Sequence, residues 1–354
     1  MNKVVNKKDV TSRSGQPLVS VIMITYNQEK YIEEAVLSVV NQTTSFPYEI
    51  IVADDASTDT TPEIVDNLRK RYHDKIRFIR RDNNLGLQHN FIDAYRHAKG
   101  EFIAICEGDD FWCSTHKLQR QVNFLKSHPD CSVCFHKVVN YYCDDESKSL
   151  SNPRQKKILT LEDLANGNVI TNLSVMYRRV DIDLLPGWLA EIKLFDYGFH
   201  SIHASYGNIG FINRPMAVYR RHSKGLWSAD IRKAQQLALD VREKLIVHFS
   251  FSRPEASANY LGAYEKIAVD LAAFFKNVGK DDECRELINR VVLFTSQIGK
   301  PVSKIDMEKR IASRISHIEK KASPALAIKK GLTQCRTFVS RLIPLPRKIR
   351  RHKD

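Results

Sequence analysis

The first third of the chain alternates between short apolar segments and segments with helical periodicity. Each apolar run is of the kind that forms a strand buried on both faces, and a helical segment follows each of the first three. This alternation is typical of a parallel, doubly wound sheet with right-handed crossovers. We therefore expect an α/β fold, whose first strands are residues 18–25, 49–53, 76–79 and 102–106.

Capping signals indicate where the helices between these strands begin and end. Thr61 is predicted to cap the second helix, with Pro62 at its first position, which is a strong start signal. The third helix is predicted to end before Gly100, because glycine is common just past a helix. Ser114 and Thr115 are good N-caps for the helix that follows them.

The pattern changes again near residue 230. From there glycine thins, strand signals vanish and apolar residues recur at helical spacing. We expect a flexible N-terminus (1–17), an α/β domain (18–228), a helical C-terminal domain (229–322) and a basic amphipathic tail (323–354). The later elements predicted for the α/β domain are helix 118–125, strand 131–142, loop 144–157, helix 161–165, strand 173–177, a helix from Phe195, and strands 209–212 and 216–219.

Cysteine usage and hydropathy predict a cytoplasmic protein. The seven cysteines are an odd number and form no secreted disulfide framework, which indicates a reducing compartment. Cys131 and Cys134 have redox or zinc spacing, but no second pair completes it, so a buried strand is the preferred interpretation. The N-terminus is polar and no apolar segment approaches the roughly 20 residues of a membrane span.

Two acidic clusters follow predicted strands. Glu107, Asp109 and Asp110 follow the fourth strand, while Asp54 and Asp55 follow the second, so both clusters should lie on the same edge of the sheet. Like charges this close repel one another unless a cation lies among them, and hard oxygen ligands suit Mg²⁺ or Mn²⁺. The alternative for both clusters is a set of solvated turns that cap the next helices.

Three segments together resemble the family 2 glycosyltransferases of the GT-A fold. They are residues 19–27, 50–59 and 107–110, and their order and spacing are more specific than any one motif. Further patterns at 46–50, 107–112 and 117–122 are similar to bacterial members that build surface polysaccharides. The resemblance implies an inverting, metal-dependent enzyme of the hexosyl or N-acetylhexosaminyl type. Such an enzyme would move a sugar from a nucleotide-sugar donor, UDP-linked, to a hydroxyl of a glycan or lipid-linked acceptor.

The resemblance also implies which residues bind the nucleotide. Asp55 would accept the uracil N3–H with Asp54 beside it, since a carboxylate selects a base that donates there. The alternative for these two residues is a turn, with Ser57 and Asp59 capping. The residues implied to line the nucleotide pocket are Thr25, Tyr26, Asn27, Asp54, Asp55, Asn84 and Gly86.

The metal ligands and the base follow from the same resemblance. The family's metal motif is Asp-x-Asp, and this chain carries Glu107 at its first position, which makes Asp109 and Asp110 the safer ligands for Mn²⁺ or Mg²⁺. His222 is similar to a C-terminal histidine that completes the metal or phosphate shell. Asp196 lies where the family carries its catalytic aspartate, although Phe195 replaces the usual preceding acid, and a helix N-cap is the alternative. Arg220, Arg221 and Lys224 would add positive charge for the diphosphate, with Asp109 close to it.

The net charge of +14 is concentrated at the C-terminal end. From Ala325 onward, nine basic residues interleave with apolar ones against the single acidic residue Asp354. A basic amphipathic segment of this kind predicts peripheral contact with the anionic inner face of the cell membrane, and the alternative is a solvated tail. Nucleic acid is not an expected partner, because no recognition module accompanies the charge.

Two other functions compete with sugar transfer. A sugar nucleotidyltransferase of the same fold type would need a glycine-rich loop after the first strand to hold a triphosphate, and residues 25–30 contain no glycine. A non-catalytic nucleotide-sugar-binding scaffold at the membrane would need no base, so the role of Asp196 discriminates it from an enzyme.

Overall fold

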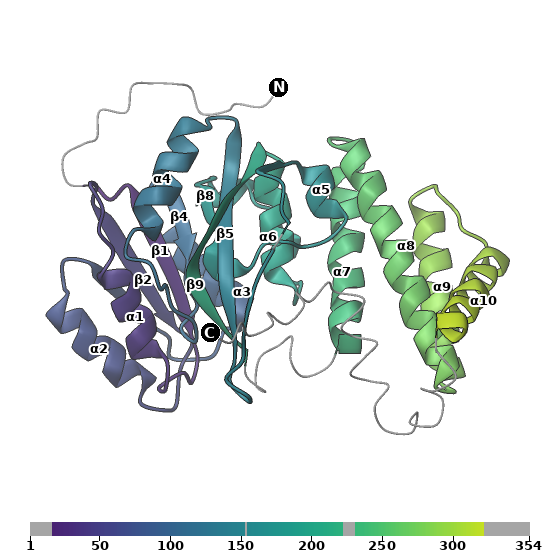
Figure 1. The fold of residues 1–354 in the computed structure, drawn as a ribbon, viewed down its shortest axis with the longest axis horizontal. Coiled ribbons are helices and arrows are strands. Elements are labelled where there is room, and N and C mark those ends of the chain that lie inside the picture. The colour runs from purple at the N-terminus through teal and green to yellow at the C-terminus, as the bar shows by residue number, and fades with distance from the viewer. Residues whose placement is uncertain (1–15, 153, 222–230, 322–354) are drawn as a thin grey trace, which may run out of the picture. The chain divides into compact units, whose positions relative to one another are not determined.

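The computed structural model describes residues 16–152, 154–221 and 231–321 (Figure 1). The chain divides into two compact units, and each is described by itself. The first comprises the chain up to Val139 together with Ile170–Pro186 and Ile209–Arg220. The second comprises Asn140–Val169, Gly187–Asn208 and the chain from Arg221.

The first unit is built on one mixed sheet with flanking helices (Figure 1). The strand order is β3-β2-β1-β4-β8-β5-β9, in which β1 pairs in parallel with β2 and β4, and β2 with β3. Strand β8 is antiparallel to both β4 and β5. The predicted α/β class with a mostly parallel sheet is thus confirmed. Its elements are β1 (Val19–Thr25), α1 (Ile32–Val40), β2 (Tyr48–Asp54), α2 (Thr61–Arg71), β3 (Ile76–Arg80), α3 (Leu87–Arg96), β4 (Phe102–Ile105), α4 (Lys117–Ser127), β5 (Cys131–Tyr142), η1 (Asn172–Ser174), β8 (Met176–Arg178), η2 (Ile182–Leu184) and β9 (Asn208–Arg221).

The apolar runs became central strands because both of their faces are covered. Strands β1, β2 and β4 are almost entirely buried, which matches their unbroken hydrophobic sequence. Cys131 and Cys134 are free thiols buried in β5, as predicted. Residues 209–219 form one long strand, β9, rather than the two short strands predicted.

Three local predictions were wrong. Helix α3 ends at Arg96, so Gly100 is not its C-terminal glycine. A Cβ on Gly100 would lie 2.4 Å from the Ser20 nitrogen, and the close approach to β1 therefore requires glycine there. Helices α2 and α4 have Thr60 and His116 as N-caps, neither with a side-chain capping bond, and the residues predicted to cap them lie one or two positions away.

The second unit contains a helical C-terminal region, as the sequence predicts (Figure 1). Helix α8 begins at a proline, and three acidic residues occupy the first turn of α9, where they oppose the positive end of the helix dipole. Within the described ranges, none of the helices is long and apolar enough to cross a membrane. The elements are β6 (Lys148–Leu150), β7 (Ile158–Leu159), α5 (Leu161–Ala165), η3 (Gly187–Ala190), α6 (Phe195–Ala204), α7 (Ile231–Phe249), α8 (Pro254–Asn277), α9 (Asp281–Gln297) and α10 (Lys304–Lys321).

Candidate active site

Both acidic clusters lie at the same edge of the sheet, as predicted. Strand β1 lies between β2 and β4, and its last residue, Thr25, pairs with Asp54 in the parallel register. Beyond the end of β4, the Gly108 nitrogen donates to the Ile24 carbonyl (3.2 Å). The carboxyl ends of three neighbouring parallel strands therefore bring the two clusters to either side of β1, in the crevice where open α/β sheets bind ligands.

The turn after β1 is tied to the turn after β2. Asn27, with φ of 52°, donates its backbone N–H to Ser57 Oγ (2.8 Å) and accepts the Thr58 N–H on its side chain (2.8 Å). Asp54 accepts from both the nitrogen (3.1 Å) and the hydroxyl (2.5 Å) of Ser57. These bonds fix the edge at which Thr25 and the 48% exposed Tyr26 lie.

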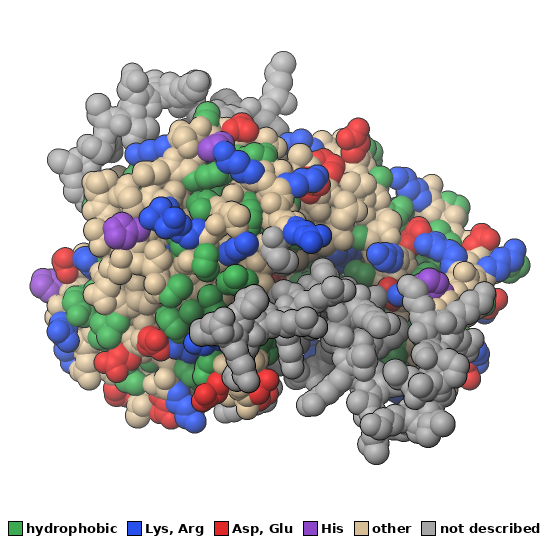
Figure 2. All heavy atoms as spheres, in the orientation of Figure 1, with side chains coloured by type: hydrophobic (Ala, Val, Ile, Leu, Met, Phe, Trp, Pro, Cys, Tyr) green, Lys and Arg blue, Asp and Glu red, His purple; other side chains and the backbone are tan. Residues whose placement is uncertain are grey.

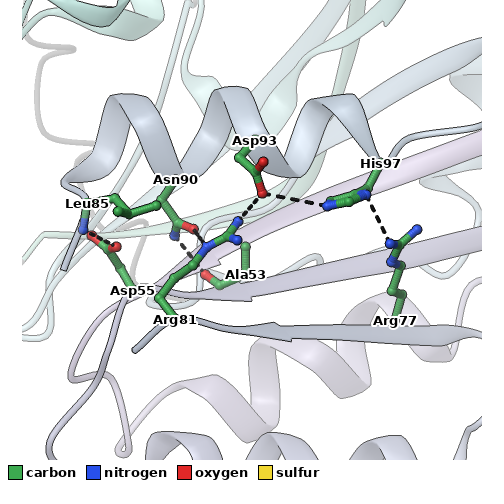
Figure 3. Close-up of polar contacts among 8 residues, drawn as sticks. All are labelled: Ala53, Asp55, Arg77, Arg81, Leu85, Asn90, Asp93 and His97. Atoms are coloured by element: carbon green, nitrogen blue, oxygen red, sulfur yellow. Dashed lines mark hydrogen bonds and ion pairs between the residues drawn. The ribbon is translucent and has the colours of Figure 1, made fainter. Parts of the chain in front are cut away.

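Asp55 holds the loop in front of α3 (Figure 3). Its two oxygens accept the backbone N–H groups of Leu85 (2.7 Å) and Gly86 (2.9 Å), while Asn84 Nδ2 donates to its carbonyl (3.1 Å). Gly86 has a φ of 81°, a conformation that favours glycine. The structure thus brings together three residues that were predicted to shape one pocket. A carboxylate has about four acceptor sites, so two remain for a ligand.

A polar network that the sequence did not reveal anchors α3 behind this loop (Figure 3). Buried Asn90 accepts from Arg81 Nε (3.2 Å) and donates to the Ala53 carbonyl of β2 (2.9 Å). Arg81 also pairs with Asp93, which lies 3.6 Å from His97 Nε2. Because this network joins α3 to β2 and to the end of β3, it fixes the loop that Asp55 contacts.

The acidic stretch after β4 is held by residues from distant parts of the first unit. Asp110 is 1% exposed and accepts the backbone N–H of Arg220 (2.7 Å), and Arg220 Nη1 donates to the Asp109 carbonyl (2.8 Å). Asn172 Nδ2 donates to Glu107 Oε1 (2.5 Å). Burial, followed by the charges of Asp109 and Glu107, raises the pKa of Asp110 well above its ordinary value. A divalent cation would relieve this repulsion.

The donor set fits a metal that shares its shell with substrate. Among the residues described, no three His, Cys, Asp or Glu side chains gather closely enough to hold an ion by themselves. Mg²⁺ is usually held by one or two carboxylates together with waters and substrate phosphates. Asp109 and Asp110 can supply the carboxylates. His222 and Lys224 lie outside the described residues.

Arg220 is a structural cation of this site. Its guanidinium pairs with Glu34 and lies over the rings of Phe111 (4.5 Å) and Tyr31 (5.1 Å). Beside it, α1 and the Phe111–Trp112 turn line a cavity of about 420 Å³. Arg221 belongs to the second unit, where its guanidinium lies 5.6 Å from the Tyr142 ring centre.

A fully buried lysine below the acidic stretch was not predicted. Lys117 Nζ donates to Gln121 Oε1 (2.7 Å) and lies 3.9 Å from the centre of the Trp112 ring. Burial lowers its pKa to about 7. Lysine at a helix start normally indicates an exposed position, so only the fold reveals this one.

Asp196, in the second unit, is the second residue of α6. It accepts the Tyr197 N–H (2.8 Å), whereas Leu194 is the N-cap, so Asp196 is not the capping residue. Burial raises its pKa to about 6. His200 and His203 on the same helix have pKa values lowered by burial to about 3 and about 4, which keeps them neutral.

Comparison with known proteins identifies the family. The family described as glycosyl transferase family 2 matches residues 20–224. An uncharacterized protein of Mycobacterium tuberculosis strain H37Rv is 42% identical over 211 residues, which are 59% of this chain and 60% of that protein. TuaG of Bacillus subtilis, named as a glycosyltransferase and ascribed to teichuronic acid biosynthesis, is 29% identical over 248 residues, 66% of this chain and 91% of TuaG.

Among solved structures, Staphylococcus aureus TarS (residues 1–349) with UDP-GlcNAc has a TM-score of 0.53 at 18% identity, covering 85% of this chain and 91% of that one. The same fragment with UDP has a TM-score of 0.52 at 19% identity and the same coverage. These likenesses confirm the GT-A-type fold. The match to the mycobacterial relative spans about 60% of that relative's length. With a family match over residues 20–224 and the predicted motifs at one sheet edge, the chain belongs to glycosyl transferase family 2.

Proposed function

We propose that this chain transfers a sugar from a UDP-linked nucleotide-sugar donor to a hydroxyl of a glycan or lipid-linked acceptor, with inversion, in the synthesis of a bacterial surface polysaccharide. The observation that carries the proposal is the meeting of the Asp54–Asp55 turn and the Glu107–Asp110 stretch beside the end of β1. That edge offers hydrogen-bond acceptors for the nucleotide base on one side and hard anionic ligands for a metal ion on the other.

The Asp54–Asp55 side of this edge fits the uracil base of a uridine nucleotide. Asp55 is rigid, since two backbone N–H groups hold its carboxylate, and its remaining acceptor sites suit the uracil N3–H. Thr25, Tyr26 and Asn27 would form the opposite wall of the pocket. TarS, which shares the fold, is described in complex with UDP and with UDP-GlcNAc, and this supports a uridine donor here.

The anionic side fits the diphosphate and its cation. Asp109 and Asp110 would hold Mn²⁺ or Mg²⁺, with Glu107 and His222 as further ligands and Arg221 adding positive charge. When bound, the ion supplies positive charge for the departing nucleoside diphosphate. Arg220 holds Asp110 and the Asp109 backbone in place.

Asp196 is the proposed general base. As the acceptor oxygen bonds to the anomeric carbon, the bond from that carbon to the diphosphate oxygen breaks, and the hydroxyl proton passes to the Asp196 carboxylate. A pKa of about 6 suits this role, because the group is mostly ionised at neutral pH yet more basic than an ordinary aspartate. A single displacement of this kind inverts the anomeric centre.

The proposed setting is the cytoplasmic face of the cell membrane. The tail from residue 323, which lies outside the described residues, would contact anionic lipid, and residues 18–228 and 229–322 would act as catalytic and helical domains. A non-catalytic scaffold is the alternative, and since it would need no base, the turnover of Asp196→Asn discriminates it from an enzyme.

A binding screen tests the proposal directly. Nucleotide sugars that carry uridine, guanosine, cytidine or thymidine, and the corresponding nucleoside triphosphates, are titrated with and without Mn²⁺. We expect a UDP-sugar to bind most tightly and only weakly in EDTA. Preference for a nucleoside triphosphate would instead support a nucleotidyltransferase, and equal binding of all bases would contradict the role of Asp55.

A further inference from the structure

A second cavity lies between α8 and α10 in the helical region of the second unit. These two helices pack against each other (Figure 1), and the cavity between them has a volume of about 550 Å³. This volume is within the range of small-molecule sites, and the cavity is open to solvent, where Lys266 and Lys309 are exposed. None of its lining residues falls within residues 20–224, the part matched by the family. Those that carry polar groups are Lys266, Asp270, Lys309, Arg310, Ser313, Arg314 and His317.

Helical spacing brings these groups to one side. Met307 and Ile311 are buried and hold α10 against its neighbours. Arg310, Arg314 and His317 follow one another at four and three residues, so they form a single row on the flank of α10.

The cavity carries more positively charged side chains than there are carboxylates to pair with them. Arg314 forms an ion pair with Asp270 (2.6 Å) and Arg310 with Glu265 (2.8 Å), so both arginines already have carboxylate partners. Lys266 also interacts with the charge of Asp270, but that carboxylate already pairs with Arg314. Four cationic side chains at the cavity therefore share two carboxylates, those of Asp270 and Glu265.

Charges of both signs occur over the helical region. On the face seen in Figure 2, Lys and Arg side chains over the helical region are interspersed with Asp and Glu. The cavity is lined by two lysines, a serine and a histidine in addition to the two paired arginines, so cationic groups outnumber the carboxylates there. Such donors bind phosphoryl oxygens.

We propose that this cavity binds a ligand that carries a diphosphate group. The volume exceeds what one phosphate fills, and two ammonium groups on facing helices match a ligand with at least two negative charges. Lys266 on α8 and Lys309 on α10 hold the phosphoryl oxygens, and Ser313 adds a hydroxyl donor. The chain's own tail is not a suitable occupant, because its sequence from Ala325 is itself basic.

Titration calorimetry of the full chain with inorganic pyrophosphate in EDTA tests the site. The pocket variant is Lys266→Ala/Lys309→Ala, and its matched control, Lys300→Ala/Lys304→Ala, removes the same charge from exposed positions outside the cavity. We expect at least tenfold weaker binding by the pocket variant and little change in the control. Lys266→Arg/Lys309→Arg should retain most of the affinity, and all variants should bind UDP with Mn²⁺ as the wild type does.

Several results would overturn the proposal. They are no binding of pyrophosphate by the wild type, an equal loss of binding in the control, or a loss of binding in Asp109→Asn with both lysines intact, which would place pyrophosphate in the donor pocket. Farnesyl pyrophosphate in detergent separates two sources of the diphosphate: tighter binding than inorganic pyrophosphate indicates a lipid-linked ligand, and equal binding a soluble one. Loss of pyrophosphate binding with UDP binding retained leaves the proposed sugar transfer untouched, so the two proposals fail separately.

Discussion

Lys117 gives a prediction whose size follows from the structure. Burial lowers its pKa from 10.5 to about 7. One pKa unit corresponds to about 1.4 kcal/mol, so burying the protonated lysine costs on the order of 5 kcal/mol of folding free energy. This full cost applies where the lysine is protonated in both the folded and the unfolded chain. The cost is complete below pH 7 and disappears as the pH rises toward 10.5, because the lysine is then neutral in both states.

The free energy of unfolding of the wild type is expected to rise with pH in this range. Between these two pH values the unfolded state binds a proton that the folded state does not, so the free energy of unfolding of the wild type gains about 1.4 kcal/mol per pH unit from this group. Lys117→Met keeps the length of the side chain and its contact with Trp112 but removes the charge. The substitution also leaves Gln121 Oε1 without its donor, a loss of about 1–3 kcal/mol.

We therefore expect Lys117→Met to be more stable than the wild type by about 2–4 kcal/mol at pH 6 and less stable near pH 10. Urea unfolding, followed by the fluorescence of Trp112 and the other tryptophans at several pH values, measures this difference. Lys126→Met, on the same helix but exposed, is the matched control and should show no such crossover. A constant difference between Lys117→Met and the wild type across this pH range would show that Lys117 is charged in the folded protein.

Three further predictions concern substrate and membrane. Asp55→Ala should weaken UDP binding by about 1–3 kcal/mol, measured by calorimetry, because the uracil N3–H would lose its acceptor and the loop before α3 would lose the carboxylate that holds it; unchanged affinity would make Asp55 a turn residue only. Asp196→Asn should keep donor binding while turnover falls roughly 10²–10⁴-fold, and wild-type kcat/KM should rise with pH up to about 6 and then level off. Asp183→Asn, an exposed carboxylate near Arg96, is its control, and equal loss in both would refute the base. Deletion from Ala325 should release the chain from anionic vesicles, at about 1 kcal/mol per basic residue, and retained binding would contradict the anchor.

Much of the fold could be predicted because its strands are fully buried. A strand covered on both faces must be apolar along its whole length, so β1, β2 and β4 were visible as runs, and the alternation with helices determined that they pair in parallel. Because the strands are parallel, Asp54 and Asp110 must both lie at the edge of the sheet formed by the carboxyl ends of the strands. That part of the candidate site required no knowledge of distant contacts.

The rest depends on contacts between residues far apart in the sequence. Gly100 was predicted to follow the end of a helix. Glycine is required there because the backbone of β1 lies too close for a Cβ atom, and no local sequence pattern reveals this contact. Likewise Asn172 reaches Glu107, and Arg220 reaches both Glu34 and Asp110. Lys117 is hidden because a charged residue at a helix start normally faces solvent. Such partners are determined by packing, and a single sequence carries no signal for them.

The central claim is metal-dependent sugar transfer at the edge beside β1. Release of UDP from the UDP-sugar selected in the binding screen, with a hydroxyl acceptor present, measures it most directly for the wild type, for Asp109→Asn and for Asp130→Asn, an exposed aspartate that serves as control. We predict turnover by the wild type and Asp130→Asn in Mn²⁺, with loss of at least 10²-fold in EDTA and in Asp109→Asn. Full turnover in EDTA, or by Asp109→Asn, would contradict the account.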